Sequence, residues 1–249
     1  YIDKFQKTLI ELRLNFSHKL TQHLNTLFSV EFKHQNTSQI INFQNDFLGI
    51  EKRRWQLAND ADIPILQSRQ FTGGLNYERD GWLLDVEGYY KEVDGVTMRS
   101  QGFQTKYQFT KGIGSYEVLG VDVLARKQWR DLSFWLSYST MDNTYTFPDT
   151  EEVTFRSNFD IRHTVKVGSA YKIGNFKIAA GVNWRTGKPT TALQQGQEIV
   201  DGNLSFGSAN EEEFKDYVRI DVSALYQITS KKGWRADLGI SIWNIINQE

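Results

Sequence analysis

The chain has 249 residues, a net charge of −1 and a pI near 6.5, so no bulk field would draw it to nucleic acid or to anionic lipid. It contains no cysteine, which excludes disulfide bridges and thiolate metal sites. Its mean hydropathy is −0.51 and it has no run of about 18 apolar residues, so no transmembrane helix is encoded. A membrane β-barrel passes this test, because half of each of its strands faces water.

Ten segments alternate apolar and polar residues with the period of two that is typical of a strand with two different faces. We predict strands at about 7–20, 24–33, 71–78, 82–90, 119–126, 132–139, 162–173, 176–185, 218–227 and 235–242. The pattern is clearest at 160–191, where two long strands flank a Gly-Asn turn. Apolar side chains there line one face, while the other face is charged or very small. Such a wall suits a boundary between lipid and a wet lumen.

The connections between these segments alternate in length. Short turns are predicted near 21–23, 79–81, 129–131, 172–175 and 230–233. Long segments without regular structure are predicted near 36–63, 95–115, 141–158 and 187–214. Outer-membrane barrels sort their connections in this way, with short periplasmic turns and longer extracellular loops.

Tryptophans support the same interpretation, because Trp82, Trp129 and Trp234 all lie beside short turns, as in an aromatic girdle at one membrane interface. The predicted fold class is therefore all-β: an antiparallel transmembrane β-barrel segment of about ten strands. The alternative is a large soluble sheet protein whose aromatic residues simply form its core.

Several motifs resemble the C-terminal barrel of TonB-dependent outer-membrane receptors. Arg162-His163, the runs WRTGKPT at 184–190 and YVRIDV at 217–222, and the pair Asn244 and Asn247 occur in the order found in that family. Tyr89-Tyr90-Lys91 before Asp94-Gly95-Val96, and Gly120-Val121-Asp122, are similar to two earlier family signatures. The resemblance covers essentially the whole chain.

This resemblance implies that residues 1–249 are a single partial domain of a 22-stranded barrel, which we expect to supply strands 12 to 21. The family's plug domain, its TonB-contacting segment, the first barrel strands and the last strand are expected to lie outside this stretch. Both ends of the chain should then lie at the extracellular rim. The missing strands should come from the rest of the same polypeptide, because unpaired strand edges are costly in lipid.

The sequence predicts no catalytic, cofactor or metal site. Its four histidines lack ligand spacing, and neither a nucleophile motif nor a phosphate-binding loop follows a strand. Candidate ligand-capture residues are Arg53, Arg54, Trp55, Glu211, Glu212 and Glu213. The first three could stack on and pair with an anion, and the glutamates could capture a cation, although solvated loop faces are the alternative for both. Arg185, Arg219 and Asp221 are predicted to face the lumen, paired with one another or with the plug.

The leading hypothesis is a receptor and transporter in the outer membrane of a Gram-negative bacterium, with no enzymatic activity and no cofactor. It would take up a scarce nutrient, such as a siderophore, vitamin, glycan or peptide, by force from TonB on the plug. Expected partners are outer-membrane lipid, the plug and remaining barrel strands, and TonB, with a surface lipoprotein as a candidate further partner and no nucleic acid. The alternative is a passive porin or an outer-membrane anchor for a surface complex.

Overall fold

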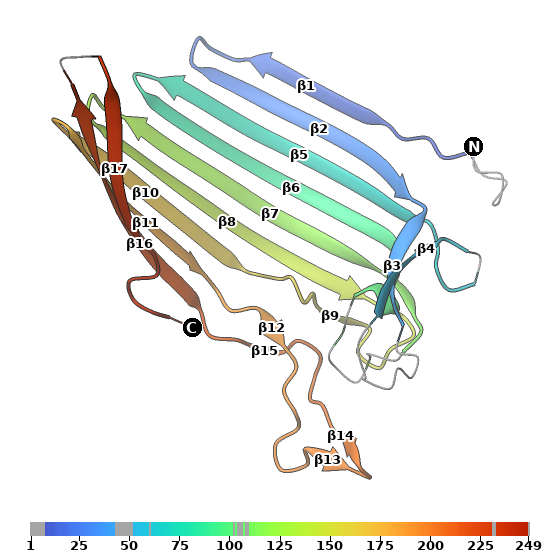
Figure 1. Ribbon diagram of the computed structural model, residues 1–249. Helices are drawn as coiled ribbons and strands as arrows, with labels where there is room; N and C mark the ends of the chain where they lie inside the picture. The colour runs from blue at the N-terminus through green and yellow to red at the C-terminus, as the bar shows by residue number, and fades with distance from the viewer. Residues whose placement is uncertain are drawn as a thin grey trace.

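The computed structural model describes residues 8–42, 52–59, 61–101, 103, 107, 110–230 and 233–248. Ten long strands form one antiparallel sheet in which each strand pairs with its neighbours along the chain (Figure 1). Their order is β1 (Arg13–Lys19), β2 (Leu24–Gln35), β5 (Leu66–Arg79), β6 (Trp82–Thr97), β7 (Ile113–Gln128), β8 (Leu132–Thr146), β10 (His163–Ile173), β11 (Phe176–Arg185), β16 (Tyr217–Thr229) and β17 (Arg235–Ile242). The predicted strands, their order and the all-β class are confirmed. Within the described residues, no helix is long and apolar enough to cross a membrane.

Two-residue turns close several of the hairpins. Arg79 pairs with Trp82, and the two residues between them, Asp80 and Gly81, have φ values of 49° and 77°. Positive φ at both central positions is the geometry of a type I′ turn, whose twist matches that of the strands. The Gly-Asn turn at 174–175 likewise joins paired residues, since Ile173 lies opposite Phe176.

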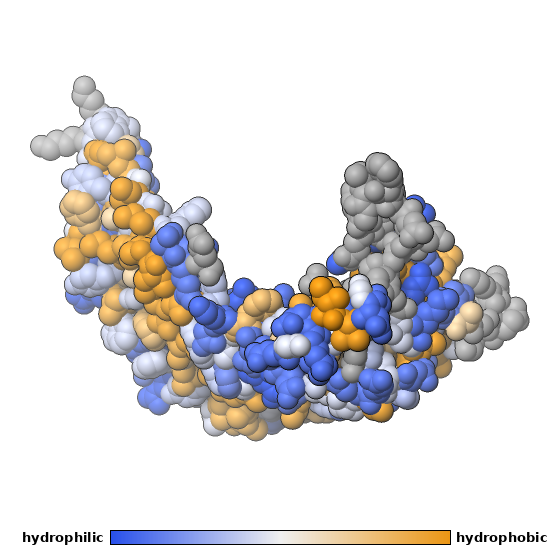
Figure 2. Space-filling view, turned by 90° about the horizontal axis from the view of Figure 1, so that it is seen from below, coloured by the Kyte–Doolittle hydropathy of each residue, from blue (hydrophilic) through white to orange (hydrophobic). Residues whose placement is uncertain are grey.

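The sheet curves into an open trough, and apolar residues cover much of its outer surface (Figure 2). On β17, Leu238, Ile240 and Ile242 are 62%, 66% and 55% exposed, although side chains of this kind are normally buried. An extended apolar surface of this kind on a soluble protein would be a liability, whereas lipid would solvate it. The convex face therefore suits contact with lipid.

Two tryptophans at the short-turn end lie side by side, as expected for an aromatic girdle at a membrane interface. The rings of Trp82 and Trp129 meet edge to face with centroids 6.4 Å apart. The Nζ atom of Lys127 lies 4.9 Å from the Trp82 ring and 5.6 Å from the Trp129 ring. An ammonium over indole faces is attractive, and it places a cation at headgroup level.

Several wall strands extend farther towards the long loops than predicted. β6 continues to Thr97 beyond the predicted end at residue 90, and β8 continues to Thr146 beyond residue 139. The apolar-polar alternation stops in these extensions, but their backbone pairing with β7 continues. Strand pairing outside a membrane needs no lipid-facing side, so the periodicity marks only the membrane-spanning part.

The long segments also contain regular structure that the sequence did not predict. Segment 36–63 contains the hairpin β3 (Thr37–Asn42) and β4 (Lys52–Leu57), and a 3₁₀ turn, η2 (Met98–Ser100), follows β6. β9 (Thr154–Arg156) pairs with the end of β8. In segment 187–214, β12 (Pro189–Thr190) pairs with β15 (Glu212–Glu213), and β13 (Ile199–Val200) pairs with β14 (Asn203–Leu204) around a turn at Asp201-Gly202. The two- and three-residue strands are too short to give a period-two signal, and β3 places two apolar residues, Ile40 and Ile41, next to each other instead of alternating.

Candidate ligand-binding site

The long connections meet at one end of the sheet and share an aromatic core. Its buried members come from the ends of β6 and β8 and from three loops: Val93, Val96, Met98, Phe103, Tyr107, Tyr145, Phe147, Phe155 and Ala209, here called the loop core. The Phe103 ring packs edge-on against those of Tyr145, Phe147 and Phe155, with centroids 5.4 to 5.8 Å apart. Edge-to-face aromatic packing adds stability beyond the buried area. The loops therefore form a packed cap on the end of the sheet.

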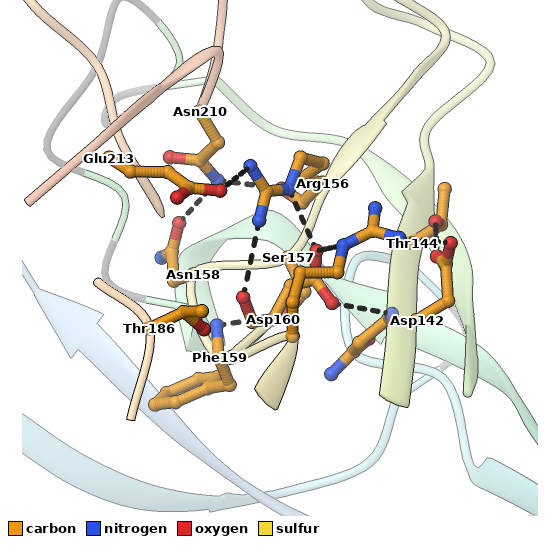
Figure 3. Close-up of polar contacts among 12 residues, drawn as sticks. Asp142, Thr144, Arg156, Ser157, Asn158, Phe159, Asp160, Thr186, Asn210 and Glu213 are labelled. Carbon is orange, nitrogen blue, oxygen red and sulfur yellow. Dashed lines mark hydrogen bonds and ion pairs between the residues drawn. The ribbon is translucent and has the colours of Figure 1, made fainter. Parts of the chain in front are cut away.

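A buried carboxylate fixes the cap to β8 (Figure 3). Asp160 is fully buried, and its Oδ2 accepts hydrogen bonds from Nε of Arg156 at 2.7 Å and Nε of Arg162 at 2.8 Å. Its Oδ1 accepts a third from the backbone N–H of Asn143 at 3.0 Å. Arg162 also donates to Asp142 at 2.7 Å. A buried charge is tolerated only when it is paired and hydrogen-bonded in this way. We call this arrangement the Asp160 network.

The segment 187–214 is attached to the same network. Arg156 donates from Nη1 to Glu213, and Asn210 donates from Nδ2 to the carbonyl of Arg156 and to Oδ1 of Asn158, both at 2.7 Å (Figure 3). Burial alone would lower the pKa of Arg156, but its hydrogen bonds to Asp160 and Glu213 raise that pKa above its ordinary value. The guanidinium thus stays charged while it joins two loops.

Below the cap, the concave side of the wall contains a cavity of about 630 Å³. Its floor carries Glu87 and Asp122, which are paired residues on β6 and β7. Tyr89 and Met141 line the cavity nearer the cap. Still nearer the cap lie Lys91, Val118 and Asn143, which are directly opposite one another on β6, β7 and β8. The loops contribute Ser100, Gln101, Ser157 and Phe159 to the lining. The volume lies in the range of small-molecule sites.

A glycine lets an aromatic ring lie flat along the cavity wall. Tyr89 lies opposite Gly120, and a Cβ atom added to Gly120 would come within 2.4 Å of Cζ and Oη of Tyr89. The same arrangement recurs farther along the sheet, where Trp135 lies opposite Gly168 and covers it. Only glycine leaves room for the ring, so Gly120 sets the position of Tyr89.

The structure places the predicted capture residues away from this cavity. Arg53, Arg54 and Trp55 lie on β4 with exposed side chains, Trp55 at 67%. In the acidic run 211–213, residues 212 and 213 form β15, and Glu213 pairs with Arg156. None of the six is among the described residues that line the cavity. Their role in ligand capture stays a prediction.

The three residues predicted to face the lumen lie on paired strands. Arg219 donates from Nε to Asp221 at 2.8 Å, and Asp221 also accepts from the backbone N–H of Asn244 at 2.9 Å. The guanidinium of Arg185 lies 5.0 Å from the ring of Tyr217. Asp221 lines a second cavity together with Trp135 and Gly168.

Sequence reasoning did not assign the cavity residues to a site. The alternation of apolar and polar residues predicts that Glu87, Tyr89 and Asp122 lie on the polar faces of their strands. Nothing in the sequence indicates that Glu87 lies opposite Asp122. A long loop joins β6 to β7, and their register shifts between Asp94 and Val96. Alternation fixes which face a residue lies on, but the residue directly opposite it is fixed from sequence most clearly where a short turn joins the two strands.

A family model described as "TonB dependent receptor-like, beta-barrel" matches residues 11–242. No curated protein matches the chain. Solved structures share its fold, and three of them are named here. They are the ferripyoverdine receptor of the outer membrane of Pseudomonas aeruginosa (TM-score 0.64, 11% identity), the unliganded ferric citrate transporter FecA (0.64, 15%) and the ferric yersiniabactin uptake receptor FyuA from Yersinia pestis (0.63, 13%).

The matches cover 96%, 95% and 95% of this chain, but only 29%, 33% and 32% of those chains in the same order. The chain therefore spans about a third of the length of these solved structures. At such low identity, the likeness establishes the fold of the shared part and leaves the ligand open.

Proposed function

The chain belongs to the TonB-dependent receptor-like β-barrel family, and on this premise we propose that it forms part of the wall and the loop cap of an outer-membrane nutrient receptor. Members of this family are receptors and transporters in the outer membrane of Gram-negative bacteria. In this proposal the cap captures a scarce nutrient, a siderophore, vitamin, glycan or peptide, and force from TonB on the plug opens a path along the concave wall. The chain itself performs no catalysis.

The observation that carries the proposal is the packed cap over a cavity of about 630 Å³. A passive pore needs an open mouth, and an anchor for a surface complex needs no cavity. Here the loop core and the Asp160 network hold three loops in a fixed arrangement above the concave wall. A receptor needs such fixed loops, because a preorganised site loses less entropy when it binds.

Partners follow from the family and from the surface. The convex face suits outer-membrane lipid, and the concave side would hold the plug of the full-length protein, through which TonB acts. The two edge strands, β1 and β17, would pair with the remaining wall. No described feature identifies a surface lipoprotein as a partner.

Uptake measurements in the host bacterium test this function. A strain without the full-length receptor should lose growth on one limiting nutrient, when iron, vitamin, glycan and peptide sources are limited in turn. Removal of TonB from the wild-type strain should give the same defect, and removal of both should add nothing. Uptake that depends on the receptor but persists without TonB would indicate a passive porin instead.

A further inference from the structure

Two carboxylates face each other on the floor of the cavity. Glu87 on β6 and Asp122 on β7 are paired residues, and side chains at directly opposite positions have Cβ atoms about 4.5–5.5 Å apart. Like charges in this position repel. Within the described part of the chain, neither carboxylate has a hydrogen bond or an ion pair, whereas the nearby Asp85 accepts a hydrogen bond from Nδ2 of Asn76 at 3.0 Å. The floor therefore carries uncompensated negative charge.

The cavity contains little positive charge to balance this pair. Lys91 is the one basic residue among the described residues that line it, and its Nζ lies 6.0 Å from the centroid of the Tyr116 ring. Lys91 stands four residues from Glu87 on the same strand, so their Cα atoms are about 13 Å apart. Its ammonium lies against Tyr116, which is paired with Val93 and so is farther still along the strand, and charges more than a Debye length apart are largely screened.

The geometry does not suit a metal ion. Among the described residues, no group of three or more His, Cys, Asp or Glu side chains is placed to hold one. Zn²⁺ normally takes three or four protein ligands and Ca²⁺ takes six to eight oxygen ligands, which two carboxylates do not supply. An organic cation requires less, since an ammonium or a guanidinium can donate a hydrogen bond to each of two facing carboxylates.

A second unmet polar group belongs to a residue that lines the same cavity, nearer the cap. Asn143 lines the cavity with only 9% of its surface exposed, and its Oδ1 accepts no hydrogen bond from the described residues. Buried polar atoms normally have a partner. Asn143 pairs with Val118, which stands four residues from Asp122 and hence about 13 Å from the floor. Tyr89 and Phe159 supply aromatic surface to the lining.

We propose that this cavity binds an elongated ligand that places a protonated amine between Glu87 and Asp122 and a hydrogen-bond donor near Asn143. The inference rests on the proposed receptor function and names the ligand chemistry of its site. A basic oligopeptide and an amino-sugar oligomer both carry this chemistry. An anionic iron complex would instead meet the two carboxylates, with one lysine to attract it.

Binding to the full-length receptor in detergent, measured by isothermal titration calorimetry, tests the proposal. The probes are a tetrapeptide with one lysine and a tetramer of glucosamine, each compared with its N-acetylated counterpart, and ferric citrate as an anion. At least one amine probe should bind at least tenfold more tightly than its acetylated counterpart and than ferric citrate. The probe that shows this preference identifies the source of the amine.

The variant Glu87→Gln/Asp122→Asn should weaken binding of that amine probe at least tenfold and leave the acetylated counterpart unchanged. Asp237→Asn is the matched control, because Asp237 is a carboxylate that lines a different cavity near the short turns. The Asp237→Asn receptor should bind the amine probe with the affinity of the wild type. The single variant Glu87→Gln serves if the double variant does not give a heat-modifiable barrel on a semi-native gel.

Three results would overturn the proposal: neither amine probe binds, acetylation has no effect, or ferric citrate binds more tightly than both amines. A double variant that keeps its amine affinity but melts at a lower temperature would also overturn it, because the cation between the carboxylates would then belong to the plug. These failures leave the receptor function standing if TonB-dependent uptake persists. Loss of TonB dependence would reject the receptor function, whatever the amine affinity.

Discussion

The membrane wall and the loop cap are stabilised in opposite ways. The wall exposes its large apolar side chains, such as Leu238 and Ile240, and is held together by backbone pairing between strands. The cap buries its aromatic residues in a common core, with Tyr145 and Phe147 almost fully buried. One chain thus contains a part built for lipid and a part built like a soluble protein. The boundary between them lies where the apolar-polar alternation of β6 and β8 ends.

The largest effect should come from the centre of the cap. Phe147→Ala removes a ring that contacts Phe103, Tyr145 and Phe155, and should destabilise the cap by about 3–5 kcal/mol, the usual cost of such a change in a core. Hydrogen exchange of the full-length receptor should show faster exchange in 147–162 and 187–214, with wall strands unchanged. Phe176→Ala is the control, because Phe176 is 51% exposed on the convex face. If hydrogen exchange in the cap became equally faster in both variants, the contrast between a buried cap core and an exposed wall surface would be wrong.

A charge on the convex face should produce the next largest effect. Ile240→Lys should cost about 2–4 kcal/mol, because it places an ammonium in hydrocarbon near the middle of the membrane. The neighbouring Gly239→Lys should cost far less, since a Cβ there meets its nearest atoms only at 3.8 Å and points to the wet side. Urea unfolding in lipid vesicles measures both. Similar costs at 239 and 240 would refute the assignment of faces.

A smaller effect is expected where the wall shapes the cavity. Gly120→Ala forces the Tyr89 ring away from the wall, and overpacking of this kind costs about 1–3 kcal/mol. Ligand affinity should fall as Tyr89 moves into the cavity. Gly181→Ala is the matched control on the same face, because its Cβ would meet Val167 O at an ordinary 3.6 Å. Unchanged affinity in the Gly120 variant would show that Tyr89 does not border the bound ligand.

The smallest effect should come from the ion pair between loops. Glu213→Gln removes the charge opposite Arg156 while leaving the Asp160 contact, and a partly exposed pair is worth about 0.2–1 kcal/mol. Limited proteolysis should cut 187–214 a few times faster, and high salt should abolish the difference between variant and wild type. A larger effect, or one that salt does not change, would mean that Glu213 acts through more than charge.

The wall could be predicted from sequence because its constraints are local. Alternation along 176–185 and the turns at Asp80-Gly81 and Gly174-Asn175 specify faces and hairpins within short stretches of chain. These signals held for all ten long strands. They failed only at the ends of strands such as β6, where the pairing continues without a lipid-facing side.

The cap and the cavity could not be predicted, because their contacts join distant parts of the sequence. Phe103 meets Phe147 and Phe155 from a different loop, and Glu213 meets Arg156 across 57 positions. Even Asp160, close to Arg156 and Arg162 in sequence, gave no signal that it would be buried. The opposition of Glu87 and Asp122 depends on a register that no short turn sets.

The meander order of the sheet has a consequence for how the wall assembles. Among the described residues, each long strand pairs with the long strands next to it along the chain, so these pairings need no distant segment. Hairpins such as β5–β6 and β10–β11, with two-residue turns, close small loops and should form early. Joining them across the long connections costs little more, since each doubling of loop length adds only about 0.6 kcal/mol of closure entropy. The loop core differs, because segments from three separate connections meet in it and can do so only when the strands that carry them are paired.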